Sequence, residues 1–296
     1  MIDLSIVIVS YNTERLLRNC LKSVQESVDS LEKEVIIIDN ASTDGSVEMV
    51  RREFPDCRVI INKENFGFGM ANNVGAREAK GDYLLFLNSD TTVFKDTLVE
   101  LINLVRKSGV RVASCRLVNP NGSIQPQGGF LPRLSKIAAW MLFLDDLPMI
   151  GDLIRPYQQR RKHFFERDQI LGWVSGTALL VERDLFFKLS GFDEKIFMYG
   201  EDLEFCYRAK KAGEKVYYFA KPIIKHMGHG SGGREQAILG EYRGLKYFFG
   251  KHKPAWEWPF LRVLLKLGAW LRMVVFGIIL GDGSKKAIYQ KAFDLA

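Results

Sequence analysis

The chain has 296 residues, of which 47% are hydrophobic and 26% charged, a balance that excludes a disordered or low-complexity protein. Its formal net charge of +7 is concentrated near the C-terminus, where residues 243–291 hold ten lysines and arginines but only two acidic residues. A basic segment of this kind indicates an anionic partner, either nucleic acid or a phospholipid surface.

The cysteines and the N-terminus bear on the cellular compartment. The four cysteines form no C-x-x-C pair and are far apart, which is typical of free thiols in a reducing cytosol. The apolar run over residues 4–9 comes almost at once and is too short for a signal peptide. We therefore expect a cytoplasmic protein.

The first ninety residues alternate between the patterns of strands and helices. Strands are predicted over residues 4–9, 34–38, 58–61 and 83–87, and helices over residues 13–27, from 46 onward and over 70–79. Strands and helices that alternate with short links form parallel sheets. The fold class predicted for this part is therefore α/β, with a doubly wound, mainly parallel sheet.

The pattern loosens after residue 118 and then resumes. A loop rich in proline and glycine is predicted over residues 125–132, and no regular element is assigned between there and residue 172. Further elements are then predicted: a glycine-containing strand over 173–181, helices over 183–189 and 202–212, a strand over 216–219, and a helical tail from 241.

Two aspartates come just after predicted buried strands. Asp39 follows the strand over residues 34–38, and Asp90 follows the strand over 83–87 after Asn88 and Ser89. Ligands of open α/β sheets bind at the carboxyl ends of the strands, so Asp90 is a candidate for a metal ion or a phosphate. Asp39 could accept a hydrogen bond from a ribose hydroxyl or a base N–H, although a turn or N-cap role is the alternative.

Two further groups could take part in chemistry. Glu201 and Asp202 begin a predicted helix, whose dipole lowers a carboxyl pKa, whereas nearby aromatic residues would raise it toward that of a general base. The sequence leaves that balance open. His226 and His229 lie in a glycine-rich segment and could supply one imidazole to a metal, although a lone histidine pair is more often structural than ligating.

Seven motifs in order resemble the inverting family 2 glycosyltransferases of the GT-A fold, and among them the rhamnosyltransferase-type branch. The likeness runs from Leu4 to about Gly233. The motifs are Ser10-Tyr11-Asn12, Ile38-Asp39-Asn40-Ala41-Ser42-Thr43-Asp44-Gly45, Asn65-Phe66-Gly67-Phe68-Gly69, Asn88-Ser89-Asp90, Gly191-Phe192-Asp193-Glu194, Glu201-Asp202 and His226.

The resemblance implies a metal-dependent inverting hexosyltransferase that acts in cell-surface polysaccharide synthesis. Rhamnose or another hexose would pass from a UDP- or dTDP-sugar to a glycan or lipid-linked acceptor. A GT-A domain would cover residues 1–240, with a nucleotide-sugar half over 1–118 and an acceptor and catalytic half over 119–240. Residues 241–296 would form a helical extension.

The resemblance also implies roles for individual residues. Asp202 would be the catalytic base, with Glu201 beside it, and Asp90 and His226 would hold Mg²⁺ or Mn²⁺, with His229 as a second candidate for the histidine. Two larger sets would bind the substrates: Ser10, Tyr11, Asn12, Asp39, Asn72, Asn88, Ser89 and Asp90 the donor, and Trp173, Gly176 and Tyr199 the acceptor.

The chain departs from the family pattern at two places. Asn88 replaces the first acid of the D-x-D-type motif, so the metal site has one charge fewer. Ala71-Asn72-Asn73 replaces the A-R-N segment, so the usual arginine contact is missing or comes from Arg77.

The chemistry of such a transfer agrees with these roles. A hard divalent cation prefers oxygen ligands, and a donor that arrives activated needs one base and no general acid. A nucleotidyltransferase is an alternative, but the basic glycine-rich loop that it needs near the N-terminus is absent. A non-catalytic nucleotide-sugar-binding module is a further alternative, and we expect no nucleic-acid partner.

The tail predicts a membrane-surface helix. Apolar residues recur through residues 259–280, but the uncharged run over 273–281 is too short to span a bilayer, which needs about 20 apolar residues. We expect an in-plane helix, with Trp256, Trp258 and Trp270 at the headgroup level and a polar side made by Arg262, Lys266 and Arg272. Packing on the enzyme, or on a partner in a homodimer, is the alternative. With the in-plane helix, the protein would be peripheral on the cytosolic face of the cell membrane.

Overall fold

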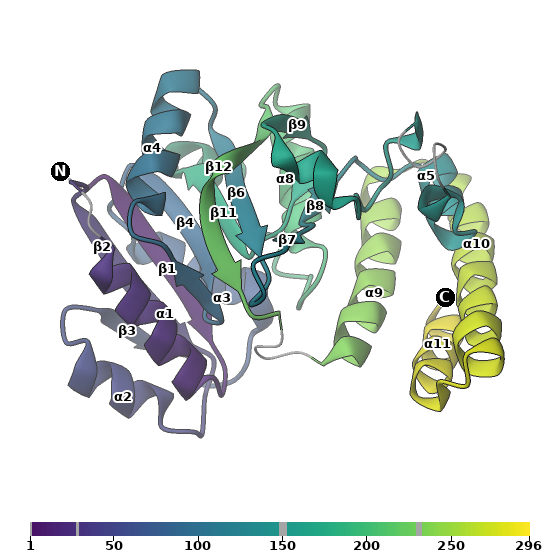
Figure 1. Ribbon diagram of the computed structural model, residues 1–296, viewed down its shortest axis with the longest axis horizontal. Coiled ribbons are helices and arrows are strands. Elements are labelled where there is room, and N and C mark those ends of the chain that lie inside the picture. Colours follow the sequence, from purple (N-terminus) through teal and green to yellow (C-terminus); the bar gives the residue numbers. More distant parts are fainter. Residues whose placement is uncertain (1, 28–29, 148–152, 229–232) are drawn as a thin grey trace. The chain divides into compact units, whose positions relative to one another are not determined.

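The computed structural model of the protein describes residues 2–27, 30–147, 153–228 and 233–296 (Figure 1). Two compact units make up the chain. The first, the sheet unit, comprises Met1–Gln127, Arg160–Phe197 and Glu201–Ser231. The second, the helical unit, comprises Gly128–Gln159, Met198–Gly200 and Gly232–Ala296. The division at residue 240 into a transferase domain and an extension stays a prediction.

The strands are β1 (Leu4–Ser10), β2 (Lys33–Asp39), β3 (Arg58–Ile61), β4 (Tyr83–Asn88), β5 (Thr91–Val93), β6 (Val112–Val118), β7 (Ile124–Gln125), β8 (Gly128–Gly129), β9 (Gln169–Leu171), β10 (Trp173–Val174), β11 (Ala178–Glu182) and β12 (Val216–His226). The helices of the sheet unit are α1 (Glu14–Glu26), α2 (Ser46–Glu53), α3 (Gly67–Glu78), α4 (Thr97–Ser108), η2 (Lys162–Glu166), α7 (Arg183–Lys188) and α8 (Glu201–Lys211). Those of the helical unit are α5 (Leu134–Met141), η1 (Leu144–Asp146), α9 (Arg234–His252), α10 (Glu257–Arg272), η3 (Met273–Ile279) and α11 (Gly283–Leu295).

The main sheet confirms the predicted α/β class. Its strand order is β3-β2-β1-β4-β11-β6-β12-β5, and the first four strands in that order are parallel. Strand β11 is antiparallel to both β4 and β6, whereas β12 runs parallel to β6. The sheet is thus mainly parallel around the predicted ligand edge and mixed beyond it, the doubly wound arrangement expected of a GT-A fold.

Helices cover both faces of this sheet (Figure 1). One face packs on α1, α2 and α4 through alternate residues of the strands, such as Ile6 and Leu85. The other face carries Phe86, which contacts Phe186 of α7 and Phe192 at centroid distances of 4.9 Å. Strands buried on both faces read as unbroken apolar runs, which is why the sequence identified them.

Helix α3 packs unusually close to the sheet. Gly75 permits this, because a Cβ there would lie 2.4 Å from Cγ1 of Val7 on β1. Gly67, at the start of α3, has a φ of +78°, and a Cβ there would lie 2.1 Å from the Phe197 carbonyl oxygen. The loop that ends with Phe197 is thereby held against the N-terminus of α3.

Two predicted strands differ from the observed ones. The strand predicted over residues 173–181 is interrupted by a turn at 175–177 that separates β10 from β11. Strand β12 is longer than predicted and continues to His226, with a bulge over residues 220–222 that contains Pro222. A proline fits a strand at a bulge, where no ladder hydrogen bond is needed from its nitrogen.

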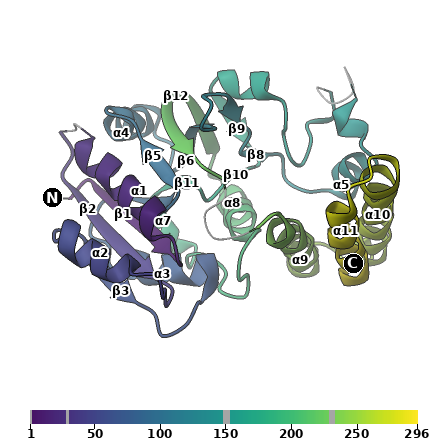
Figure 2. The same ribbon diagram turned by 60° about the horizontal axis from the view of Figure 1, so that its bottom comes forward.

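The helical unit contains the predicted helical tail. Helices α5, α9 and α11 all contact α10 (Figure 2). Within the described residues, no helix combines the length and the apolar character needed to cross a lipid bilayer.

Candidate active site

The carboxyl ends of three neighbouring strands bring most of the predicted donor-binding residues together, with the exception of Asn72 of α3. In the register of the sheet, Ser10 of β1 pairs with Asp39 of β2, and Val9 pairs with Asn88 of β4. The Ser10 hydroxyl lies 3.0 Å from that of Thr13, which donates to the Ser89 hydroxyl at 3.2 Å. Thr13, which the sequence did not single out, therefore links the ends of β1 and β4.

Asp39 is buried and offers an acceptor to a ligand. Its Oδ2 accepts a hydrogen bond from the Ser42 N–H at 2.8 Å. Its Oδ1 is also buried, and no residue in the described part of the chain donates to it. Because buried polar atoms are nearly always hydrogen-bonded, this oxygen is suited to a donor on a bound molecule.

Asn12 holds two loops together beside Asp39. It adopts a left-handed backbone conformation with a φ of 52°, which asparagine tolerates better than most residues. Its N–H donates to the Ser42 hydroxyl at 2.9 Å, and its side-chain oxygen accepts from the Thr43 N–H at 2.8 Å. Tyr11, the neighbour of Asn12, is more than a third exposed at this edge.

The segment Ala71-Asn72-Asn73, which replaces A-R-N, lies within α3 and not at the ends of the strands. Asn72 is buried in α3, where its Nδ2 donates to the Phe68 carbonyl at 3.0 Å. Arg77 is half exposed and lies 3.7 Å from the carboxylate of Glu194. Its described contact is therefore with Glu194, in the motif that follows Phe192.

Asn73 of the same segment attaches a distant loop to α3. Its Nδ2 donates to the Phe192 carbonyl at 2.9 Å, and its Oδ1 accepts from the Phe192 N–H at 2.8 Å. The asparagine side chain thus satisfies both backbone groups of one residue in the loop before Glu201. This role was not predicted, because it joins residues 119 positions apart.

Asp90 and His226 lie next to each other because β5 pairs with the end of β12. His226 is opposite Thr91 in that pairing. The His226 Nε2 lies 3.2 Å from Asp90 Oδ1, while Asp90 Oδ2 accepts from the Gly228 N–H at 3.1 Å. The two predicted metal-binding side chains, 136 positions apart in the sequence, therefore meet. His229 lies outside the described residues.

The other ring nitrogen of His226 contacts Gln125. The distance from His226 Nδ1 to Gln125 Oε1 is 2.8 Å. Donation from Nδ1 to this oxygen would leave Nε2, which faces Asp90, as the ring nitrogen that could coordinate a cation. Gln125 was predicted only as the start of a loop, but it forms the short strand β7 against β6.

Asp202 is held by two backbone N–H groups at the start of α8. Gly176 donates to its Oδ2 at 2.9 Å, and Leu203 donates to its Oδ1 at 2.7 Å. The carbonyl of Thr177, next to Gly176, accepts from the Asn88 N–H at 3.0 Å. The turn that interrupts the predicted strand thus connects Asp202 to the end of β4.

The environment of Asp202 answers the question that the sequence left open. Burial raises the pKa of the Asp202 carboxyl, and the N–H groups of Gly176 and Leu203 lower it by a smaller amount. The net shift is upward, in the direction that makes a carboxylate a better base. Its neighbour Glu201 is buried.

The predicted acceptor residues fall in both units. Trp173 of β10 is half-buried in the sheet unit, where Gly176 also lies. A Cβ on Gly176 would lie 2.9 Å from Cε1 of Phe68 and 3.7 Å from the Cβ of Asp202. Tyr199 belongs to the helical unit, where it packs on Gly240 of α9.

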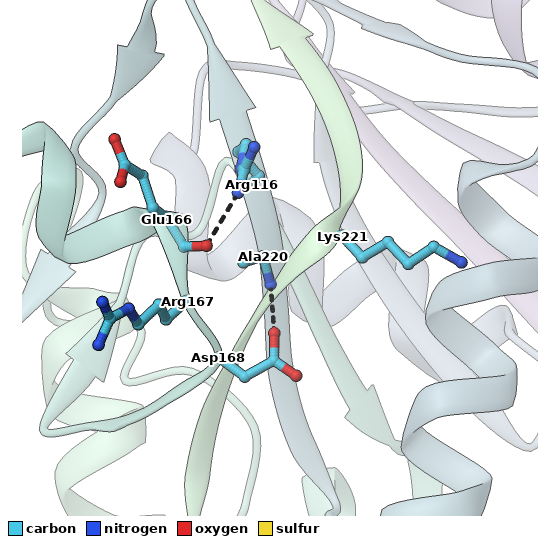
Figure 3. A pocket seen from close by; sticks show the side chains of 6 residues that line it. All are labelled: Arg116, Glu166, Arg167, Asp168, Ala220 and Lys221. Atoms are coloured by element: carbon cyan, nitrogen blue, oxygen red, sulfur yellow. Dashed lines mark hydrogen bonds between the residues drawn. The ribbon is translucent and has the colours of Figure 1, made fainter.

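A shallow hollow of about 430 Å³ lies elsewhere on the sheet unit (Figure 3). It is lined by Arg116, Glu166, Arg167, Asp168, Ala220 and Lys221, and none of the predicted site residues is among them. The Asp168 carboxylate accepts from the Ala220 N–H at 2.8 Å, so it supports the β12 bulge. The mixed charges of this hollow give it no preference for an anionic donor.

Comparison with known proteins extends over most of the chain. The N-acetylglucosaminyl-diphospho-decaprenol L-rhamnosyltransferase of Mycobacterium tuberculosis is 27% identical over 271 residues, which cover 86% of this chain and 87% of that protein. The rhamnosyltransferase WbbL of Escherichia coli is 25% identical, over 76% of this chain and 83% of that protein.

Solved structures share the fold. The mannosyltransferase PcManGT from Pyrobaculum calidifontis, in complex with GDP-Man and Mn²⁺, aligns over 99% of this chain and 83% of its own, with a TM-score of 0.58 and 18% identity. TarS residues 1–349 from Staphylococcus aureus align over 99% of this chain and 90% of their own, with a TM-score of 0.55 and 14% identity.

The family model that matches this chain agrees with the strand order and with the motifs. It is that of glycosyl transferase family 2, and it matches residues 5–185. That range contains the four parallel strands and the aspartates at their ends. The chain is a glycosyltransferase and belongs to glycosyl transferase family 2.

Proposed function

We propose that this chain is a metal-dependent inverting glycosyltransferase that transfers rhamnose or a related hexose from a dTDP- or UDP-sugar to a lipid-linked or glycan acceptor. The observation that carries the proposal is the meeting of three groups at one sheet edge: the Asp39 loop, the Asp90–His226 pair, and Asp202 of α8, which accepts a hydrogen bond from the turn beside β4. The named activity of the rhamnosyltransferase relatives, one of which acts on a diphospho-decaprenol lipid, supports the choice of substrates.

The donor would bind across the ends of β2, β1 and β4. The buried Oδ1 of Asp39, to which no residue in the described ranges donates, suits the N3–H of uracil or thymine, which is a hydrogen-bond donor. The hydroxyls of Ser10 and Ser89 and the amide of Asn88 line the same edge and suit the ribose and the phosphates.

The residues around Asp90 fit a divalent cation. A carboxylate oxygen and an imidazole nitrogen lie 3.2 Å apart, and Gln125 and Gly228 orient them from the other side. Among the described residues, no third histidine, cysteine or acidic side chain joins the pair, so most remaining ligands would be donor oxygens and water. When bound, Mg²⁺ or Mn²⁺ would offset the charge that develops on the departing diphosphate.

Asp202 would act as the base. Its pKa is raised by burial, and the N–H groups of Gly176 and Leu203 fix the direction of its carboxylate. It would take the proton of the acceptor hydroxyl as that oxygen attacks the anomeric carbon. The bond to the nucleoside diphosphate breaks on the opposite face, so one displacement inverts the configuration.

A donor panel tests this function. The purified chain would be incubated with Mn²⁺, a lipid-diphosphate-linked N-acetylglucosamine, and in turn dTDP-rhamnose, UDP-glucose, UDP-N-acetylglucosamine and GDP-mannose. We expect nucleoside diphosphate release only with a dTDP- or UDP-sugar, and a product whose mass rises by one sugar and whose anomeric configuration is inverted by NMR. Transfer from GDP-mannose alone, or a retained configuration, would overturn the proposal.

A further inference from the structure

Helix α10 carries an exposed apolar stripe. Its residues recur at spacings of three and four, which place them on one side of the helix. They are Trp256, at the N-cap, and Phe260, Val263, Leu267 and Trp270, and each is between 38% and 64% exposed. A single exposed apolar side chain is ordinary, but five along one helix form a continuous surface.

The opposite side of α10 already makes the packing contacts that the helix needs. Leu261, Leu265 and Ala269 are fully buried there, against α5, α9 and α11 (Figure 2). Helix α10 is therefore apolar on both sides, and only one of them faces protein within its unit. The exposed stripe needs an explanation other than the core of the helical unit.

Arg272 ties the buried side of α10 to α5. This residue is buried, and its guanidinium donates to the carbonyls of Met141 at 3.0 Å and Trp140 at 2.8 Å. It also stacks 4.4 Å from the ring centroid of Phe143. The expectation that Arg272 belongs to the polar, headgroup-facing side was wrong, because the carbonyls of α5 satisfy its charge. Trp258 likewise points away from the stripe and is half-buried near Gly250.

The positive charge of the helical unit favours an anionic partner for the exposed stripe. The segments of the helical unit carry +6 of the net charge of +7. Arg262 and Lys266 flank the stripe on one side. The Arg262 Nε donates to the Ala296 carbonyl at 3.1 Å, and the Lys266 Nζ lies 5.2 Å from the ring centroid of Phe293. The end of η3 and the residue after it add Ile278, Ile279 and Leu280, each more than 60% exposed.

We infer that this face of α10 docks on the surface of an anionic lipid bilayer. The stripe is about 21 Å long at a rise of about 1.5 Å per residue, so it would lie in the plane of the interface, with its tryptophans among the headgroups and its cations toward the lipid phosphates. Packing of two such stripes in a dimer would bring Arg262 and Lys266 of both copies close together, which like charges oppose. The inference goes beyond the proposed transfer reaction and does not depend on it.

Vesicle binding tests the inference. We expect the full chain to cosediment with vesicles of phosphatidylcholine and phosphatidylglycerol, to bind pure phosphatidylcholine weakly, and to be released by salt. Tryptophan emission should shift to the blue as Trp270 enters the interface. Trp256→Gln/Phe260→Gln should lower the partition coefficient by about tenfold or more, and Val263→Asp should lower it separately.

The control replaces side chains of matched exposure in the sheet unit. Phe94 and Ile170 are 46% and 47% exposed, and Phe94→Gln/Ile170→Gln should bind vesicles like the unchanged chain. All variants should keep their melting temperatures and their transfer to a short water-soluble acceptor, so a loss of binding is distinct from a failed enzyme. The inference is overturned if the α10 variants bind as well as the control, or if the unchanged chain is a dimer that these substitutions dissociate.

Discussion

Gln125 and His226 lie 101 positions apart, yet the Oε1 of one is 2.8 Å from the Nδ1 of the other. The consequence is that Gln125 would fix which ring nitrogen of His226 carries the proton and which faces Asp90. Gln125→Leu removes that acceptor, so we expect the dissociation constant for Mn²⁺ in the presence of UDP to rise by about 10- to 100-fold, the usual cost of losing an outer-shell partner. Electron paramagnetic resonance of free Mn²⁺ measures this without turnover.

Two further variants make the Gln125 experiment specific. Gln125→Glu keeps an acceptor oxygen and should retain most of the Mn²⁺ affinity. Gln236→Leu makes the same change at an exposed position on α9 and should have no effect. An unaltered dissociation constant in Gln125→Leu would remove Gln125 from the metal site.

Asp202→Asn should lower kcat by about 10²- to 10⁴-fold, because the amide keeps an acceptor for one N–H group but cannot take a proton. The affinity for UDP, measured by calorimetry, should stay within about twofold, because the proposed role of Asp202 is to take a proton and not to bind the nucleotide. Asp184→Asn, at a side chain that is 82% exposed, provides the matched control. Turnover that survives in Asp202→Asn would exclude this residue as the base.

The raised pKa of Asp202 predicts how activity and stability depend on pH. Activity needs the ionised carboxylate, so kcat should rise with pH through an apparent pKa above the usual aspartate value of 3.8 and then level off. Folding favours the protonated form, so the stabilising contribution is present below 3.8 and is lost as the pH rises through the folded-state pKa. Asp202→Asn should therefore melt at a higher temperature than the unchanged chain at neutral pH, and the difference should disappear in acid.

Asp39→Asn should weaken donor binding selectively. In the proposed complex, the substitution puts an amide in place of an acceptor-only carboxylate beside the N3–H of the nucleobase, which would cost about 1.5–3 kcal/mol, or roughly 10- to 150-fold in the KM for the donor. We expect kcat to change by less than about threefold, because the nucleobase of the donor would lie away from the reacting atoms. Initial rates at varied donor concentration separate the two effects, and Asp56→Asn at an exposed position is the control. A fall in kcat with an unchanged KM would contradict the proposed contact between Asp39 and the nucleobase.

Gly176→Ala should disturb the Asp202 carboxylate, because the added Cβ would displace either the Phe68 ring or the turn that donates to Asp202. The added Cβ would lie 2.9 Å from the Phe68 ring, so either the ring or the turn has to move, at a cost of about 1–3 kcal/mol. We expect lower kcat and a lower melting temperature. Phe68→Leu in the same chain removes the ring carbons that clash and should restore part of the kcat. A double variant as slow as Gly176→Ala would instead locate the damage in the turn itself.

The sequence predicted the first half of the sheet well because its signals are local. Strands β1 to β4 each hold a short run of consecutive apolar residues, and the helices between them have regular apolar spacing. The end of each parallel strand is also a defined place, so Asp39 and Asp90 could be assigned to one edge. The motifs then gave the family.

The rest depended on contacts between distant residues. The turn at Gly176 lies inside an apolar run that reads as one strand, and Pro222 reads as the end of a strand although β12 continues through a bulge. The partners of Asp90 and Asp202 come from pairing and turns that no local pattern encodes. Arg272 was misassigned because a helical wheel shows which side a residue occupies but not which side is covered.

The bond between Asn73 and Phe192 has a practical consequence for exchanging parts between enzymes. A chimera that joins residues 119–296 of this chain to the N-terminal part of a relative would separate the Phe192 loop from the side chain that holds it. A residue other than asparagine at position 73 would leave both backbone groups of Phe192 unsatisfied, so the loop before α8 would lose one of its attachments to α3. The two halves are therefore not interchangeable modules unless position 73 and its loop are transplanted as a pair.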